Sequence, residues 1–232
     1  SVSPLGARVD PRAGLSVSSM DRPSSTRARS LSTKPGNRPT SLISRPPRED
    51  DAVNPFSFAG RCLLFILLAA WGWTFMVTPL ELNYAGESAL HLVSLPFHEA
   101  GHVIFMPFGR FMMVLGGTLG QIVMPLICAG TLLLKTRDAF GASVAFWWTA
   151  ENFMDIAPYI NDARALELIL LGGVTGQEVE GHDWEYLLGT LGWLQYDHRL
   201  AQLAQWIGIM IMAASLLWAG WLLRRQYQSL RR

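Results

Sequence analysis

The sequence predicts an all-α membrane protein, a polytopic bundle of about five transmembrane helices that follows a disordered N-terminal tail. Three observations predict this class. Half of the 232 residues are hydrophobic and only 16% are charged, whereas about a quarter of the residues in a typical soluble domain are charged. The apolar residues gather in five long segments beyond residue 55. The first of them, residues 62–80, has no charge across 19 residues, which is enough helix to cross a bilayer.

Residues 1–55 are expected to form a basic tail rich in Pro, Ser and Arg. Residues 1–50 hold nine of the 19 Lys and Arg residues, seven of the 13 Pro residues and eleven Ser residues. Such a segment buries too little apolar surface to offset the entropy lost on ordering, so it should remain disordered. Attraction to an anionic membrane surface is the plainest role for its positive charge.

Charge and cysteine content exclude two classes of protein. After residue 50 the chain carries ten basic and 14 acidic groups, so it lacks the basic face that a nucleic-acid-binding protein needs. The two cysteines, Cys62 and Cys128, both lie inside apolar runs. This excludes a secreted scaffold held together by disulfides.

The remaining residues, 56–232, are predicted to form the membrane domain. The expected spans cover about residues 62–80, 88–108, 111–134, 139–160 and 200–223. A polar loop, residues 161–199, separates the last two spans. Within it, residues 183–194 are predicted to form a short interfacial helix, with Asp183 as its N-cap and aromatic side chains at the lipid boundary. The basic residues divide evenly between the two sides, so the orientation stays open.

The second predicted span contains the pattern H-E-x-x-H, formed by His98, Glu99 and His102. On a helix the two histidines lie one turn apart on one face and can bind the same metal ion, while Glu99 can take a proton from a water on that ion. Polar side chains are costly in lipid unless they are paired, bound to a metal or turned toward a cavity, so the cluster indicates a functional site. The alternative is a polar patch that hydrogen-bonds between helices. The cofactor expected from the pattern is Zn²⁺.

A catalytic zinc site needs a third protein ligand and an open position for water. The fourth span offers Glu151 and Asp155, and Asp162 lies just beyond it. At helical rise, Asp155 lies about 7.5 Å from the membrane boundary and the histidines about 9–15 Å from the same side. This depth match favours Asp155, with Asp162 as the alternative. Glu151 and Asp155 could instead form a pair that shares a proton.

Three features of the chain resemble the site-2 protease family of intramembrane zinc metalloproteases: FHEAGH inside a span, the segment GGTLGQIVMP at residues 116–125, and a later span with an acidic residue after an Asn. The resemblance covers about residues 92–164. It implies that His98, His102 and a distal aspartate bind zinc, that Glu99 activates water, and that a peptide bond is cut within the membrane.

The chain departs from the family pattern at its distal motif. The family usually has Asn-x-x-Pro followed by Leu-Asp-Gly, and the nearest counterparts here are Asn152-Phe-Met-Asp155 and Asn161-Asp162-Ala163-Arg164. Alignment on the second of these favours Asp162 as the ligand. The 39-residue polar loop is too short for a PDZ-like module. The resemblance is therefore to a divergent or minimal member.

Other polar and small residues have simpler interpretations. His91 lies about 10.5 Å along the helix from His98, too far to share a metal. Asn152 either stabilises an oxyanion or satisfies neighbouring backbone. Gly116, Gly117 and Gly120 either let helices pack closely or form a re-entrant turn. His182 and His198 are interpreted as ordinary polar residues of the loop.

The expected function is that of an intramembrane zinc metalloendopeptidase, a multi-pass protein of the cell membrane or an organelle membrane. Its expected partners are a membrane-protein or peptide substrate and the lipid bilayer, but not nucleic acid; a partner subunit in the membrane stays open. Two alternatives remain: a non-catalytic membrane scaffold with a structural metal or polar site, and a transport component with a buried acidic proton relay.

Overall fold

The computed structural model describes residues 54–231, and the regular structure in this range is helical. The elements are α1 (Pro55–Val77), η2 (Leu80–Leu82), α2 (Ala89–Phe105), η3 (Met106–Phe108), α3 (Arg110–Thr131), η4 (Leu132–Thr136), α4 (Ala139–Asn161), α5 (Asp183–Leu191), η5 (Leu194–Tyr196) and α6 (Asp197–Leu230). One isolated bridge joins Ile169 and Thr175, and no strand forms between residues 54 and 231. The predicted all-α class is confirmed for this range. The disorder predicted for residues 1–55 concerns a segment that, up to residue 53, lies outside the described residues.

Three helical stretches are long and apolar enough to cross a membrane: Pro55–Val77, Arg110–Thr136 and Leu194–Leu230. They correspond to the first, third and fifth predicted spans. The second and fourth predicted spans, α2 and α4, are not among them. These two helices carry His91, His98, His102, Glu151 and Asp155. Length and composition therefore support three of the five predicted spans.

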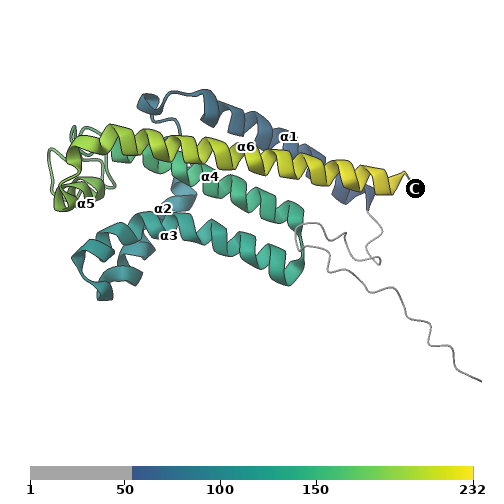
Figure 1. The fold of residues 1–232 in the computed structure, drawn as a ribbon, viewed down its shortest axis with the longest axis horizontal. Coiled ribbons are helices and arrows are strands. Elements are labelled where there is room, and N and C mark those ends of the chain that lie inside the picture. The colour runs from purple at the N-terminus through teal and green to yellow at the C-terminus, as the bar shows by residue number, and fades with distance from the viewer. Residues whose placement is uncertain (1–53, 232) are drawn as a thin grey trace, which may run out of the picture. The chain divides into compact units, whose positions relative to one another are not determined.

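Helix α4 forms the centre of the bundle. It contacts α1, α3 and α6, and Figure 1 shows α6 running along both α1 and α4. Small residues bring α4 and α6 close together: a Cβ atom at Gly208 of α6 would lie 2.8 Å from the carbonyl oxygen of Ala150. Small residues at helix contacts are the usual means of tight packing in membrane proteins. The polar residues of α4 are consequently surrounded by protein.

Glycines also bring α2 and α3 together, and this packing sets the position of the two histidines. Helix α3 runs without interruption through Gly116 and Gly120, so no re-entrant turn forms there. These glycines instead allow the helices to pack closely. A Cβ atom at Gly116 would lie 2.5 Å from the carbonyl oxygen of Gly101 on α2. Any side chain at these positions would push α2 away from α3.

The helix ends differ from the predicted boundaries because the prediction followed apolar stretches of sequence and not the local contacts that begin and end a helix. Helix α1 begins at Pro55, where the Asn54 side chain accepts a hydrogen bond from the Phe56 backbone and proline occupies the first turn. Helix α6 has 34 residues and extends beyond the predicted 200–223 at both ends. Arg61, Asp197 and Arg224 lie within these helices, although none lies in a charge-free window.

The polar loop folds back over one end of the bundle. Its first part is held by the Asp162 carboxylate, which accepts hydrogen bonds from the backbone of Glu167 and Leu168 at 2.9 and 3.0 Å. Helix α5 follows and contacts α3 and α4. The prediction that Asp183 caps this helix was wrong: His182 is the N-cap and accepts from the Glu185 backbone. Asp183 is therefore left free to point into the bundle.

Candidate metal centre

His98 and His102 lie on the face of α2 that packs against α3, and their ring centroids are 4.8 Å apart. Because the two residues are one helical turn apart, their imidazole rings lie on the same side of the helix and face the same space. Both side chains are largely shielded from solvent, with 12% and 22% of their surface exposed. Two imidazoles that are close together and shielded in this way are suited to bind one metal ion.

Each imidazole is oriented by a hydrogen bond at Nδ1. The His98 Nδ1 lies 3.2 Å from the side-chain oxygen of Gln121, and the His102 Nδ1 lies 2.9 Å from the backbone carbonyl oxygen of Met113. Both partners are oxygens that accept, so Nδ1 carries the proton in each ring. This leaves both Nε2 atoms directed at the space between α2, α3 and α5. Metal-binding histidines usually have such a partner on their other nitrogen.

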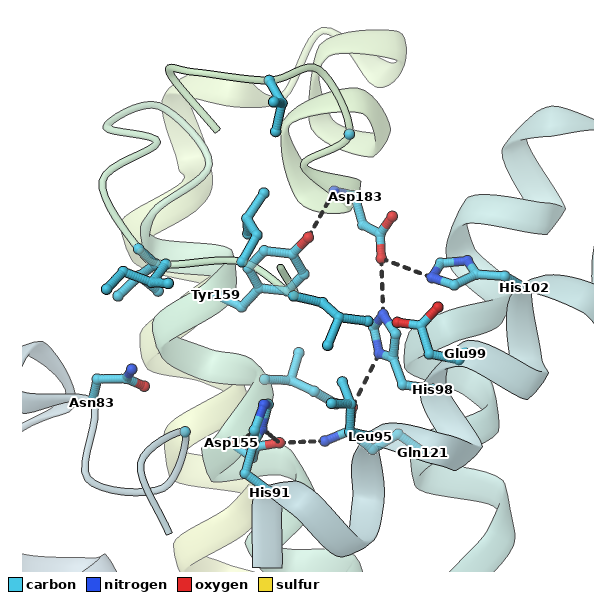
Figure 2. Close-up of a pocket in the computed structure, with 18 of the residues that line it drawn as sticks. Asn83, His91, Leu95, His98, Glu99, His102, Gln121, Asp155, Tyr159 and Asp183 are labelled. Carbon is cyan, nitrogen blue, oxygen red and sulfur yellow. Dashed lines mark hydrogen bonds and ion pairs between the residues drawn. The ribbon is translucent and has the colours of Figure 1, made fainter. Parts of the chain in front are cut away.

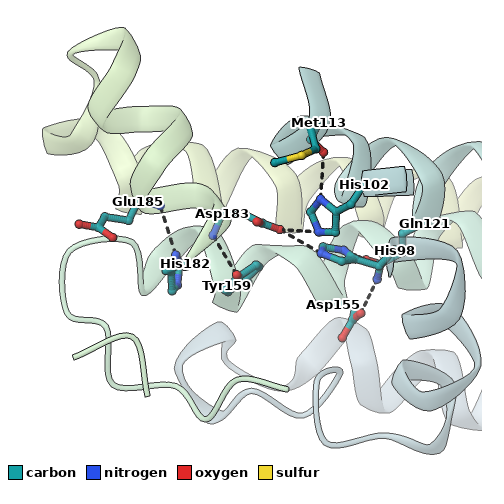
Figure 3. Close-up of polar contacts among 9 residues, drawn as sticks. All are labelled: His98, His102, Met113, Gln121, Asp155, Tyr159, His182, Asp183 and Glu185. Atoms are coloured by element: carbon teal, nitrogen blue, oxygen red, sulfur yellow. Dashed lines mark hydrogen bonds and ion pairs between the residues drawn. The ribbon is translucent and has the colours of Figure 1, made fainter. Parts of the chain in front are cut away.

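Both Nε2 atoms converge on Asp183, the first residue of α5 (Figure 3). The Asp183 Oδ2 atom lies 3.0 Å from His98 Nε2 and 3.3 Å from His102 Nε2. Two ligand atoms at about 2.0–2.1 Å from a tetrahedral zinc ion are separated by roughly 3.3 Å. The distances therefore fit a common metal, and a divalent cation would replace the protons that otherwise join the rings to the carboxylate.

Gly117 of α3 keeps open the space that a metal would occupy. A Cβ atom at this position would lie 2.5 Å from His98 Nε2 and 2.6 Å from His102 Nε2. These are the same two nitrogens that face Asp183. Position 117 thus tolerates no side chain while the histidines keep this arrangement, and the donor set and the free space together fit a zinc ion.

Glu99 completes the group from the exposed side. One ligand atom each of His98, Glu99 and His102 lie within 4.8 Å of one another. Glu99, both histidines and Asp183 line one cavity of about 380 Å³ between the helices and the polar loop (Figure 2). The other side of this cavity is apolar, with residues 168–171 of the loop. A carboxylate in this place can reach a water between itself and the Nε2 atoms.

Asp183 is held in place by two aromatic side chains. Its backbone N–H donates to the Tyr159 hydroxyl at 3.0 Å, and the Tyr159 ring contacts the His182 ring with centroids 4.2 Å apart. Burial opposes the ionisation of Asp183, but hydrogen bonds from His102 and His98 outweigh it and lower the pKa of the carboxyl. Burial also lowers the pKa of His182, which favours its neutral form. Asp183 is thus presented to the histidines as a carboxylate.

The acids predicted as third ligands lie elsewhere. Asp155 accepts hydrogen bonds from His91 and Gln121 (Figure 2), and no interaction among residues 54–231 joins it to His98 or His102 directly. Asp162 holds the loop backbone, and its Oδ2 atom lies 3.5 Å from His182 Nε2. Glu151 is fully buried away from the cavity lining.

Asn152 was predicted to position substrate or to satisfy backbone, and its contacts correspond to the second role. Its side-chain amide donates to the Trp148 carbonyl oxygen at 3.0 Å, and the residue does not line the cavity. His91 was predicted to lie too far away to share the metal and instead to line the entrance of the site or lie at the membrane interface; it lines the cavity and pairs with Asp155.

Sequence reasoning missed Asp183 as a partner of the histidines. It lies 85 residues after His98 in a loop that was expected to remain at the membrane surface. The adjacent His182-Asp183 pair at the start of a predicted helix was the available signal. We compared the chain with protein-family models, curated proteins and solved structures, and none of them matches it.

Proposed function

We propose that this chain is an integral membrane zinc metallopeptidase that hydrolyses a peptide bond of a membrane-protein substrate. The observation that carries the proposal is the convergence of His98 Nε2 and His102 Nε2 on the Asp183 carboxylate, beside Glu99, in a cavity. Three protein ligands with one side open to a cavity are typical of catalytic zinc rather than structural zinc. We take Asp183 as the third ligand in place of Asp155 or Asp162.

We also propose that α2 and α4 complete a five-span bundle. At about 1.5 Å per residue, the 17 residues of α2 and the 23 residues of α4 extend roughly 26 and 35 Å. The burial of Glu151 and Asp155 among other helices supports a span that does not expose these acids to lipid. The metal site would then lie near one membrane boundary, within reach of the polar loop.

A bound zinc ion would polarise the substrate carbonyl group and lower the pKa of water to about 7. The carboxylate of Glu99 would take a proton from a water molecule as the oxygen attacks the carbonyl carbon. The same carboxylate would then return the proton to the leaving amine. Gln121 and the Met113 carbonyl hold the imidazoles in place during these steps, and apolar residues 168–171 limit the entry of bulk water.

A scaffold whose metal only holds helices together is the competing class of protein. It is favoured by the position of Asp183, which joins α5 to α2 through the histidines. A scaffold predicts a fourth protein ligand beside His98, His102 and Asp183, but Glu99, the remaining acid of the group, is exposed. The third class, a transport component, is favoured by Glu151, an acid that is fully buried in α4.

The proposal is tested with full-length protein in lipid vesicles that also contain a pool of single-span peptides with randomised central residues. We expect mass spectrometry to find new peptide ends within the span for wild type. The variant Glu99→Gln should hold one zinc per chain and cut about 10²- to 10⁴-fold more slowly, because it loses the group that takes the proton. Equal cleavage by both proteins would contradict the assignment. Bound zinc without cleavage of any peptide by wild type would favour the scaffold.

A further inference from the structure

A chain of hydrogen bonds connects His98 to residues that do not touch the candidate metal position. His98 Nδ1 meets the side-chain oxygen of Gln121 at 3.2 Å, and the Gln121 amide nitrogen donates to Asp155 Oδ2. Asp155 is in turn contacted by His91 Nδ1, at 3.0 Å from Oδ1 and 3.1 Å from Oδ2. Figure 2 shows this chain running along the floor of the cavity from His98 to His91.

The chemistry of this network fixes the direction of every bond. A carboxylate only accepts hydrogen bonds, so Gln121 must turn its amide nitrogen to Asp155. The Gln121 carbonyl oxygen then necessarily faces His98, where it can only accept. His98 must therefore carry a proton on Nδ1, which leaves the lone pair of Nε2 for a metal.

The two histidines differ in how firmly their hydrogen-bond partners keep the proton on Nδ1. His102 is oriented by a backbone carbonyl oxygen, that of Met113, which can only accept. His98 depends on an amide side chain that could present either end. Gln121 and Asp155 are both largely buried, at 4% and 6% exposed, so their hydrogen bonds to protein partners mainly decide how they are oriented. The orientation of Gln121 thus depends on Asp155.

We propose that Asp155 is a positioning residue that acts through Gln121 to keep the Nε2 lone pair of His98 directed at the metal. This inference rests on the metal site of the proposed function. It places Asp155 behind Gln121 and His98, two residues away from the metal, whereas the sequence had suggested a direct ligand. Loss of such a partner typically weakens metal binding by about 10- to 100-fold.

The test uses zinc affinity, measured by chelator competition on the purified full-length protein. Asp155→Asn should bind zinc about 10- to 100-fold more weakly than wild type, because the new amide at position 155 can donate to Gln121 and let the Gln121 amide reverse. The double variant Asp155→Asn/Gln121→Glu keeps the same net charge. In it the new carboxylate at position 121 accepts from both the amide at position 155 and His98, so the required polarity returns and zinc affinity should recover to near the wild-type value.

Glu151→Gln is the matched control, since it replaces a buried acid one turn away on the same helix that makes no hydrogen bond to Asp155 or Gln121. Its zinc affinity should equal that of wild type. Wild-type affinity in Asp155→Asn, or no recovery in the double variant, would overturn the inference while leaving the metal site intact. If Asp155→Asn alone does not fold, the zinc affinity of the double variant tests the inference. Absence of zinc binding in wild type would instead overturn the proposed function, and the inference with it.

Discussion

Single atoms decide whether a metal fits between His98 and His102. At position 117 the absence of a side chain leaves room beside both Nε2 atoms, where a Cβ atom would lie only 2.5 and 2.6 Å away. Ordinary contacts between heavy atoms are about 3.5–4.0 Å. A methyl group would therefore force the rings apart or occupy the place of the metal.

We expect Gly117→Ala to lower zinc affinity by about tenfold or more, since it disturbs the orientation of two ligands at once. The control is Gly130→Ala on the same helix, where an added Cβ atom meets nothing within 4 Å. Zinc titration of both variants checks this expectation. Equal affinities would mean that the metal, if any, lies away from Gly117.

The sequence predicted the near residues of the site and missed the distant one, for a physical reason. His98, Glu99 and His102 are neighbours on one helical turn, so their spacing alone predicts their grouping. Asp183 reaches them only because a polar loop folds back over the bundle. Depth in the membrane can be compared only for residues within spans. The side chains of such a loop therefore cannot be placed in this way.

At the scale of elements, the loop between α4 and α5 is positioned by buried polar contacts. Asp162 holds the backbone of residues 167 and 168, and Tyr159 binds the backbone of Asp183. Arg110 at the start of α3 lies over the Tyr186 ring of α5, 4.7 Å from its centroid. These contacts fix α5 against α3 and α4. They thereby hold Asp183, the candidate third ligand, in place.

We expect Asp162→Asn to loosen this loop while zinc stays at one per chain. The change weakens two hydrogen bonds from backbone N–H groups to a charged acceptor, each of which contributes about 1.5–3 kcal/mol. Hydrogen exchange of residues 163–183 should accelerate relative to wild type, with exchange in α6 unchanged. Loss of zinc without faster exchange would identify Asp162 as a ligand instead.

Element boundaries were predicted less well than element identity. All five long helices were found from their apolar segments, but α1 begins at a capped proline, Pro55, several residues before the charge-free run. Capping is a local hydrogen bond and not a matter of hydropathy. The same limitation led to the wrong N-cap for α5, because His182 caps through a ring nitrogen rather than through the more usual side-chain oxygen.

At the scale of the whole molecule, helices α2 and α4 decide the number of spans. Only α1, α3 with η4, and η5 with α6 satisfy the length and composition of a span among residues 54–231. If α2 and α4 also cross, η4 and α5 lie on opposite sides of the membrane; with three spans, they lie on the same side. The two topologies can therefore be separated by two positions.

We expect single cysteines at Lys135 and Glu185, both accessible at the surface, to differ in labelling by an impermeant thiol reagent in sealed vesicles. Cys62 and Cys128 are first replaced by alanine. One position should react before the vesicles are opened and the other only afterwards. Reaction of both positions under the same condition would contradict five spans.

The central claim, a zinc ion held by His98, His102 and Asp183, is tested most directly by the zinc content of the dialysed full-length protein. We predict one zinc per chain in wild type and almost none in Asp183→Ala or in the double variant His98→Ala/His102→Ala, with all three proteins folded. Wild-type zinc content in Asp183→Ala, or wild-type protein without zinc, would contradict the account.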